Sequence, residues 1–157
     1  MIFVTVGTQL AFPRLIDAMQ DHAARIDEPV IAQTGEAAAG RWPDLDVRPT
    51  LAPQSFAETF ASARVVVSHA GIGTILSAAR FGRPLVMLPR RVALGEHRND
   101  HQMATAHQLE GRPGIHVAWE VEALEGFLLD PDLCAMEQGV SPERSLFLER
   151  LRALIAP

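Results

Sequence analysis

The sequence has 157 residues, of which 48% are hydrophobic and 21% are charged, a composition typical of one globular domain. Its 19 Asp and Glu residues outnumber its 14 Lys and Arg residues, so the formal net charge of −5 argues against nucleic acid as a partner. The single cysteine, Cys134, excludes an internal disulfide and favours a reducing compartment. No stretch approaches the roughly 18 apolar residues of a membrane span. We therefore expect a single domain over residues 1–157, in the cytoplasm.

The first half of the chain alternates short apolar runs with stretches of helical periodicity. Residues 2–6 form a β-branched run that predicts a buried strand, and apolar residues then recur at helical spacing over residues 15–26. The stretch at 35–43, with its glycines and proline, predicts a surface loop. The further elements predicted in this half are strands at 30–32 and 47–51, a helix at 56–63 and a strand at 65–67.

The second half continues the same alternation. It predicts a helix at 72–79, a strand at 85–88, a helix at 99–109 and a strand at 115–118. A capping serine at 141 followed by proline predicts the start of a last helix, at 143–155. Short strands separated by helices imply right-handed crossovers. We therefore expect an α/β, Rossmann-like parallel sheet with helices on both faces.

Two turns that follow predicted strands carry the features of an anion site. VGTQ, with Gly7, follows the first strand, and SHAGIGT, with Gly71 and Gly73, follows the strand at 65–67. Ligands of open parallel sheets bind beyond the carboxyl ends of the strands, where free N–H groups of helix starts attract anions. Glycines at 71 and 73 also suit a tight strand–helix turn with no ligand. Their place in the fold favours the anion site, with a diphosphate as its ligand.

Polar side chains in the same turns add hydrogen-bond donors. Thr8, Ser68 and Thr74 offer hydroxyl groups, and His69 offers a ring N–H to a phosphate oxygen. A histidine here is also compatible with a purely structural role, but its position in the turn favours contact with a ligand.

A second cluster of cationic residues lies in PRRVALGEHRNDHQ, at 89–102. It is compatible with a solvated charged loop or, taken together, with a second anion-binding surface. His97 and His101 are four residues apart, but no third ligand completes a metal site, so we expect no metal. A nicotinamide cofactor is disfavoured because Leu76 stands where G-x-G-x-x-G requires its third glycine.

These motifs together resemble a known family. SHAGIGT, GRPLVMLP and the HQ pair resemble the glycosyltransferase family 28 C-terminal domain, the donor-binding half of MurG-like GT-B enzymes. MIFVTVGTQ and PRRVALGEHRNDHQ most resemble small catalytic subunits of two-chain transferases. These are PssE-type exopolysaccharide enzymes and the subunit that adds N-acetylglucosamine to a dolichol-linked sugar. The resemblance covers nearly the whole chain and implies the C-terminal half of a GT-B fold.

The resemblance implies a UDP-sugar donor and a set of contacts. LAPQ, residues 51–54, places Gln54 at the uracil and Leu51 where relatives often have a stacking aromatic. Ser77 stands where relatives commonly have a ribose-binding glutamate, and Gln102 belongs to the pair that touches the sugar or phosphate. The expected substrate-binding set is Gly7, Thr8, Gln9, Leu51, Gln54, Ser68, His69, Gly71, Gly73, Thr74, Ser77, Arg90, Arg91, Glu96, His97, Arg98, Asn99, His101 and Gln102.

The resemblance also implies an inverting transfer without metal or cofactor, in which His69 and Arg91 stabilise departing UDP and the general base lies on a partner. The acceptor half then belongs to another chain, a membrane-anchored subunit that forms a heterodimer at the inner membrane face and helps to bind a polyprenyl-diphosphate acceptor. Arg90, Arg91 or Arg98 is a candidate partner for the carboxylate of a glucuronic acid donor in exopolysaccharide synthesis. The alternative is a nucleotide-sugar-binding regulatory or interaction module without catalysis.

Overall fold

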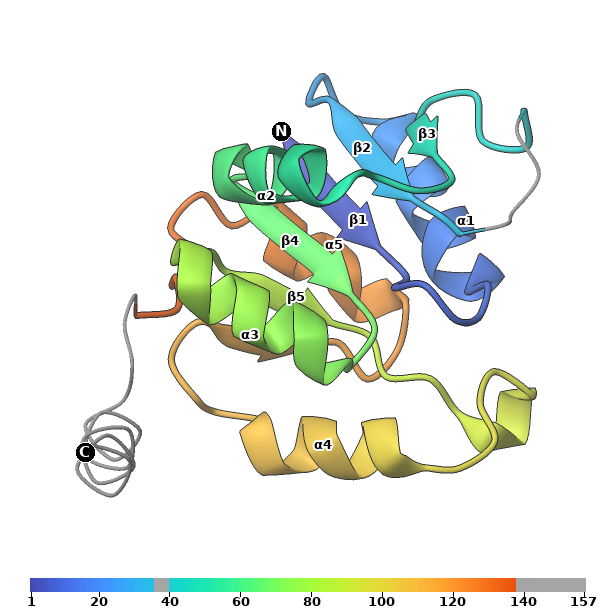
Figure 1. The fold of residues 1–157 in the computed structure, drawn as a ribbon, viewed down its shortest axis with the longest axis vertical. Helices are drawn as coiled ribbons and strands as arrows, with labels where there is room; N and C mark the ends of the chain where they lie inside the picture. The colour runs from blue at the N-terminus through green and yellow to red at the C-terminus, as the bar shows by residue number, and fades with distance from the viewer. Residues whose placement is uncertain (36–39, 138–157) are drawn as a thin grey trace, which may run out of the picture.

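A parallel sheet lies between two layers of helices in the computed structural model, which describes residues 1–35 and 40–137 (Figure 1). The strands are β1 (Ile2–Thr5), β2 (Val30–Gln33), β3 (Asp46–Arg48), β4 (Val65–Ser68), β5 (Leu85–Met87) and β6 (Ile115–Val117). The helices are α1 (Pro13–Ala23), α2 (Pro53–Ser62), α3 (Ile72–Phe81), α4 (His101–Leu109), α5 (Glu122–Leu128) and the short 3-10 helix η1 (Val92–Leu94). No helix in the described ranges has the length and apolar character needed to cross a bilayer.

The order in which successive strands are added to the sheet reverses between β1 and β4. Its order is β3-β2-β1-β4-β5-β6, and all neighbours are parallel. The chain therefore builds outward from β1 to β3, crosses back, and builds in the opposite direction from β4 to β6. Thr5 at the end of β1 pairs in register with Ser68 at the end of β4. The loops that follow these two strands are side by side, at the switch point where open α/β sheets bind ligands.

The two faces of the sheet bury separate sets of side chains because successive residues of a strand point to opposite faces. Ile2 and Val4 pack in the core that includes residues of α1 and α5, whereas Phe3 packs in the core that includes residues of α2, α3 and α4. Phe3 meets Phe56 and Phe60 of α2 edge to face, with ring centroids 5.6 and 5.9 Å apart. This packing fixes α2 against the sheet at β1.

The two edges of the sheet differ. At β3, Asp46 and Arg48 are exposed and form an ion pair of 2.7 Å. Next to β6, the segment at residues 134–136 lies close, since His116 contacts the carbonyl oxygen of Cys134 at 3.0 Å and the backbone of Met136 occupies the space beside Gly114.

The expected fold class is confirmed, and each strand and helix predicted within the described ranges is present with shifted ends. The helices α5 and η1 were not predicted. The predicted surface loop at 35–43 needs a correction at Trp42, which is buried in the core beneath α1 and donates its indole N–H to Asp17 at 2.7 Å. The helix predicted at 143–155 lies outside the described residues.

Candidate functional site

A cleft of about 610 Å³ opens at the carboxyl ends of β1 and β4. It is bounded by the loop after β1, by the start of α2, by the turn from β4 into α3, and by residues that follow β5. Its lining residues are Thr5, Val6, Gly7, Thr8, Gln9, Leu10, Gln33, Leu51, Pro53, Phe56, His69, Gly71, Ile72, Gly73, Thr74, Ser77, Arg90, His97 and Gln102.

No Asp or Glu belongs to this lining, within the part of the chain that the structure describes. The sequence as a whole has 19 acidic residues and a net charge of −5. The groups that the cleft does offer are hydroxyls, amides, two histidines and one arginine. A cavity that excludes carboxylates from an acidic protein is suited to an anionic ligand.

His69 lines the cleft, and its ring lies between Gly7 and Gly71. A β-carbon on Gly71 would lie 2.8 Å from Cε1 and 3.0 Å from Cδ2 of the His69 ring, and nearer still to Nε2. A β-carbon on Gly7 would lie 2.9 Å from Cε1. Gly7 also has a φ of +76°, which side chains rarely adopt. Both glycines are therefore needed to seat the imidazole.

The His69 ring is neutral at physiological pH. Burial, together with the positive charge of Arg90, lowers the pKa of His69 to about 4. The Ser68 hydroxyl lies 3.3 Å from Nδ1 and donates to the His69 carbonyl oxygen at 2.9 Å. A neutral imidazole has one N–H to donate and one nitrogen that accepts. The Thr5 backbone carbonyl competes for this N–H. His69 can thus contribute at most one hydrogen bond to a phosphate, without a charge of its own.

Helix α3 begins directly beside this ring. Gly71 is the N-cap residue of α3, and no side chain forms a capping hydrogen bond there. The amides of Thr74 and Ile75 donate to the Gly71 carbonyl oxygen at 3.1 and 3.2 Å. Within residues 1–35 and 40–137, no acceptor meets the N–H groups of Ile72 and Gly73. These two free donors border the cleft, where the helix dipole favours negative charge.

Arg90 closes the back of the cleft. It is 2% exposed, and its guanidinium donates to the carbonyl oxygens of Leu10 and Ala11 at 2.6 Å and of Val6 at 3.2 Å. Gln102 accepts from the Arg90 amide at 3.1 Å. Arg90 therefore joins the loop after β1 to the segment after β5, instead of extending into the cleft as a free side chain.

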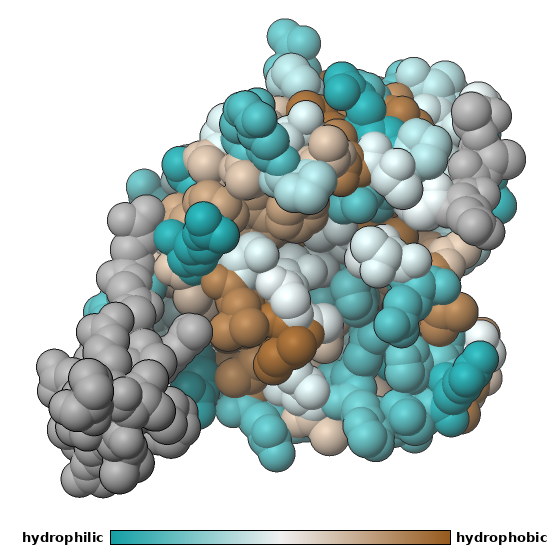
Figure 2. All heavy atoms as spheres, in the orientation of Figure 1, coloured by the Kyte–Doolittle hydropathy of each residue, from teal (hydrophilic) through white to brown (hydrophobic). Residues whose placement is uncertain are grey.

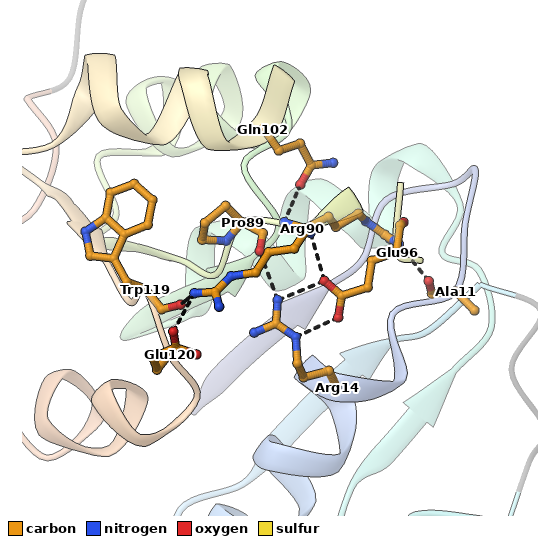
Figure 3. A network of polar contacts seen from close by, with 9 residues as sticks. Ala11, Arg14, Pro89, Arg90, Glu96, Gln102, Trp119 and Glu120 are labelled. Carbon is orange, nitrogen blue, oxygen red and sulfur yellow. Dashed lines mark hydrogen bonds and ion pairs between the residues drawn. The ribbon is translucent and has the colours of Figure 1, made fainter. Parts of the chain in front are cut away.

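The neighbours of Arg90 have their own partners (Figure 3). Glu96 accepts from Nε and Nη2 of Arg14 at 2.6 and 2.9 Å and from the Arg91 amide at 2.9 Å. The Arg91 guanidinium donates to the Trp119 carbonyl oxygen and to Glu120 at 2.7 Å, and it lies outside the cleft. The structure therefore places the Arg91 guanidinium outside the cleft lining, bound to Glu120.

The cleft brings together Gly7, Thr8, Gln9, Leu51, His69, Gly71, Gly73, Thr74, Ser77, Arg90, His97 and Gln102 of the expected set. Ser77 donates its hydroxyl to the Gly73 carbonyl oxygen at 2.9 Å. The lining does not include Gln54, Ser68, Arg91, Glu96, Arg98, Asn99 or His101. Gln54 is exposed and donates to Glu58 at 2.9 Å, one turn along α2.

Sequence reasoning missed several lining residues. Thr5 donates to Gln33 Oε1 at 3.0 Å and so links the ends of β1 and β2 at the floor of the cleft. Phe56 supplies an aromatic ring beside Leu51. A strand-end position was an available signal for Thr5 and Gln33, whereas Phe56 required knowing which side of α2 faces the cleft. The other lining residues missed are Val6, Leu10, Pro53 and Ile72.

Apolar atoms gather over α3 next to the cleft, where Ile72 and Leu76 are exposed by 67% and 53% (Figure 2). Across the described residues, no cluster of three His, Cys, Asp or Glu side chains is arranged to hold a metal ion.

The layered fold, the switch point and the acid-free cleft define a Rossmann-like domain with the architecture of the GT-B glycosyltransferase C-terminal domain. The family model of the glycosyltransferase family 28 C-terminal domain matches residues 1–114. The chain therefore belongs to the glycosyltransferase family 28 C-terminal domain family.

Solved structures share the fold at low sequence identity. MurG of Acinetobacter baumannii is 16% identical, with a TM-score of 0.64 over 98% of this chain and 49% of its own. The glycotransferase of kitacinnamycin is 22% identical, with a TM-score of 0.60 over 97% of this chain and 39% of its own. The solution structure of ALG13 is 18% identical, with a TM-score of 0.61 over 96% of this chain and 93% of its own. The chain thus spans less than half the length of the first two. No curated protein matches the sequence.

Proposed function

We propose that the chain is the donor-binding, catalytic subunit of an inverting UDP-sugar glycosyltransferase. The observation that carries this proposal is the acid-free cleft at the switch point, with the free N–H groups of Ile72 and Gly73 beside His69. A diphosphate bound there accepts from both amides and from the His69 ring. Membership of the glycosyltransferase family 28 C-terminal domain family supports a nucleotide sugar as the carrier of that diphosphate.

The uridine then lies on the side of the cleft formed by α2. Leu51, Pro53 and Phe56 supply an apolar wall for the base, and Phe56 contributes the aromatic surface that Leu51 lacks. Gln54, at the exposed start of α2, reaches the base only by leaving Glu58. We assign the ribose to Ser77, which lines the cleft along α3.

The chemical step is a displacement at the anomeric carbon. An acceptor hydroxyl oxygen bonds to that carbon, and the bond from the carbon to the diphosphate oxygen breaks. UDP leaves with the electron pair, while the hydroxyl proton passes to a base that we assign to a partner chain. The amides at the start of α3, the His69 N–H and the charge of Arg90 stabilise the growing negative charge. Arg91 joins them only after separating from Glu120, so its role is a prediction for mutagenesis.

The acceptor side is proposed to come from a second, membrane-anchored subunit. Support comes from the resemblance of MIFVTVGTQ and PRRVALGEHRNDHQ to small subunits of two-chain transferases. We propose a polyprenyl-diphosphate-linked saccharide as acceptor, in exopolysaccharide synthesis at the inner membrane face. Arg98 has no hydrogen bond or ion pair to any described residue. It is therefore the candidate for the carboxylate of glucuronic acid as the transferred sugar.

Calorimetric titration with UDP, UMP, UDP-glucuronate and NAD tests the donor site. We expect UDP to bind at least tenfold more tightly than UMP because the second phosphate reaches the start of α3, and NAD to compete poorly. Equal affinity for UDP and UMP contradicts the proposed diphosphate site. Release of UDP on mixing with the partner and acceptor tests catalysis. UDP binding without any transfer in that mixture favours the non-catalytic binding module instead.

A further inference from the structure

Arg90 is a buried cation with an unusual set of partners. It is 2% exposed, and each of its guanidinium hydrogen bonds goes to a main-chain carbonyl oxygen, including a long one of 3.4 Å to Glu96. The guanidinium carbon also lies 4.5 Å from the centre of the Phe12 ring. These are neutral groups. They accept from Nη1 and Nη2 of Arg90 but do not cancel its charge.

Among the described residues, Glu96 is the carboxylate whose charge acts on Arg90, and it is already bound by other groups. The Glu96 carboxylate is bound by Arg14 through two hydrogen bonds and by the Arg91 amide. Arg14 and Arg90 together carry two positive charges against the single negative charge of Glu96. The cluster of Arg14, Arg90 and Glu96 therefore holds one uncompensated positive charge, at the back of a cleft whose described lining has no acid.

A buried charge without a counter-ion is costly, and proteins generally pair such groups. Sites that keep an unpaired buried charge are commonly those whose ligand completes the pairing. The Nη1 and Nη2 donors of Arg90 are committed to main-chain oxygens of Val6, Leu10 and Ala11. Its effect on a ligand is therefore exerted mainly through its charge and through the loop that it holds.

We propose that Arg90 is a positioning residue that fixes the loop after β1 and whose missing counter-ion is the diphosphate of the bound ligand. This inference rests on the proposed function for the identity of the ligand. It assigns Arg90 two separable effects. The hydrogen bonds to the loop set the shape of the cleft for any ligand, whereas the charge favours ligands in proportion to their negative charge.

Calorimetry with inorganic pyrophosphate, UDP and uridine separates these effects. Arg90→Met keeps the unbranched apolar stem of the side chain and removes the charge together with the guanidinium donors, and we expect it to weaken pyrophosphate and UDP binding by about tenfold or more. Uridine, which is neutral, is expected to lose much less. Arg90→Lys keeps the charge but not the planar fork of donors. It should retain more pyrophosphate affinity than Arg90→Met.

Two further variants test the charge without altering Arg90. Glu96→Gln keeps the shape of the partner of Arg14 and adds one net positive charge to the cluster, so we expect it to bind pyrophosphate about threefold more tightly, or better. Arg112→Met removes an exposed arginine that precedes β6, at the amino ends of the strands, whereas the cleft lies at their carboxyl ends. It has the same formal charge change as Arg90→Met and is expected to leave all three affinities unchanged.

The titration of His69, followed by NMR, gives a readout that loop shape alone does not predict. Arg90 and His97 are the charged or titratable groups that lower the pKa of His69 by electrostatic interaction, in addition to burial. Removing the charge in Arg90→Met should raise the pKa of His69, whereas Arg90→Lys should leave it low.

Equal losses of uridine and pyrophosphate affinity in Arg90→Met, or no gain of pyrophosphate affinity in Glu96→Gln, overturn the proposal. Poor folding of the Arg90 variants leaves the Glu96→Gln result decisive. If the wild-type protein binds pyrophosphate as tightly as UDP, the proposed function is refuted but the role of Arg90 is not. A wild-type protein that binds neither refutes both.

Discussion

Substitution of Gly71 by alanine should displace the His69 ring and lower stability. The new β-carbon would lie 2.8 Å from Cε1 and closer to Nε2, whereas favourable carbon contacts lie near 3.5 to 4.0 Å. On its other side the ring faces Gly7, where an added β-carbon would lie only 2.9 Å from Cε1, so the imidazole is held closely between the two glycines. Overpacking of this kind costs about 1 to 3 kcal/mol, which corresponds to a fall in Tm of about 3 to 9 °C.

The assay is urea unfolding of a double-mutant cycle. Gly71→Ala is measured in the wild-type background and in a His69→Ala background. The second background lacks the imidazole ring with which the new β-carbon would clash. We expect most of the cost of Gly71→Ala to disappear in the second background, a coupling of about 1 kcal/mol or more. UDP affinity should fall by about tenfold in Gly71→Ala, because the ring moves away from the bound diphosphate.

Gly73→Ala is the matched control for this cycle. A β-carbon on Gly73 meets nothing within 4 Å, and alanine is the better helix former in the first turn of α3. Stability should therefore be equal to that of the wild type or greater by up to about 1 kcal/mol. An equal cost of Gly71→Ala in both backgrounds, or an equal cost for Gly73→Ala, would refute the explanation that Gly71 is present to seat His69.

Three further outcomes follow from particular contacts. Phe60→Ala should lower the free energy of unfolding by about 3 to 5 kcal/mol in urea titrations, since the ring is fully buried among other aromatic rings. The Arg64 guanidinium and the N-terminal ammonium group lower the pKa of Glu28 to about 2, below its ordinary value of 4.5. Its contribution to stability is therefore complete above pH 4.5 and is lost as the pH falls toward 2. Glu28→Gln should flatten the pH dependence of the urea midpoint in that window. Arg91→Ala should change calorimetric UDP affinity by less than about threefold because Glu120 holds its guanidinium outside the cleft; a larger loss would support the role in leaving-group stabilisation that sequence resemblance assigns to Arg91.

The strand and helix order was predictable because burial on both faces of a parallel sheet leaves continuous apolar runs. The run at residues 65–67 is such a case, and its valines are fully buried. Helix α5 was missed because it has only 7 residues, contains Gly126, and buries only Leu124 and Leu128. One pair at a spacing of four residues is too little to establish helical periodicity.

The site was predictable where glycines mark a turn, and less so where a side chain selects among distant partners. Gly7 and Gly71 belong to turns whose strands are adjacent in the sheet, so local pattern and topology brought them together. The direction of Arg91 depends on Glu120, which is 29 residues away, and that of Arg90 depends on carbonyl groups about 80 residues away. Such choices are made by tertiary structure, which hydrophobic spacing does not encode.

The edges of the sheet bear on how this chain behaves at high concentration. Strands at an open edge can recruit a strand of another molecule, which is a common route to aggregation. At β3 the edge is three residues long, and a recruited strand would have to dehydrate the exposed pair of Asp46 and Arg48. At β6 the segment at 134–136 stands beside the last strand. Polymerisation through continuous β-sheet is therefore disfavoured at both ends, which keeps the protein available for association through other surfaces.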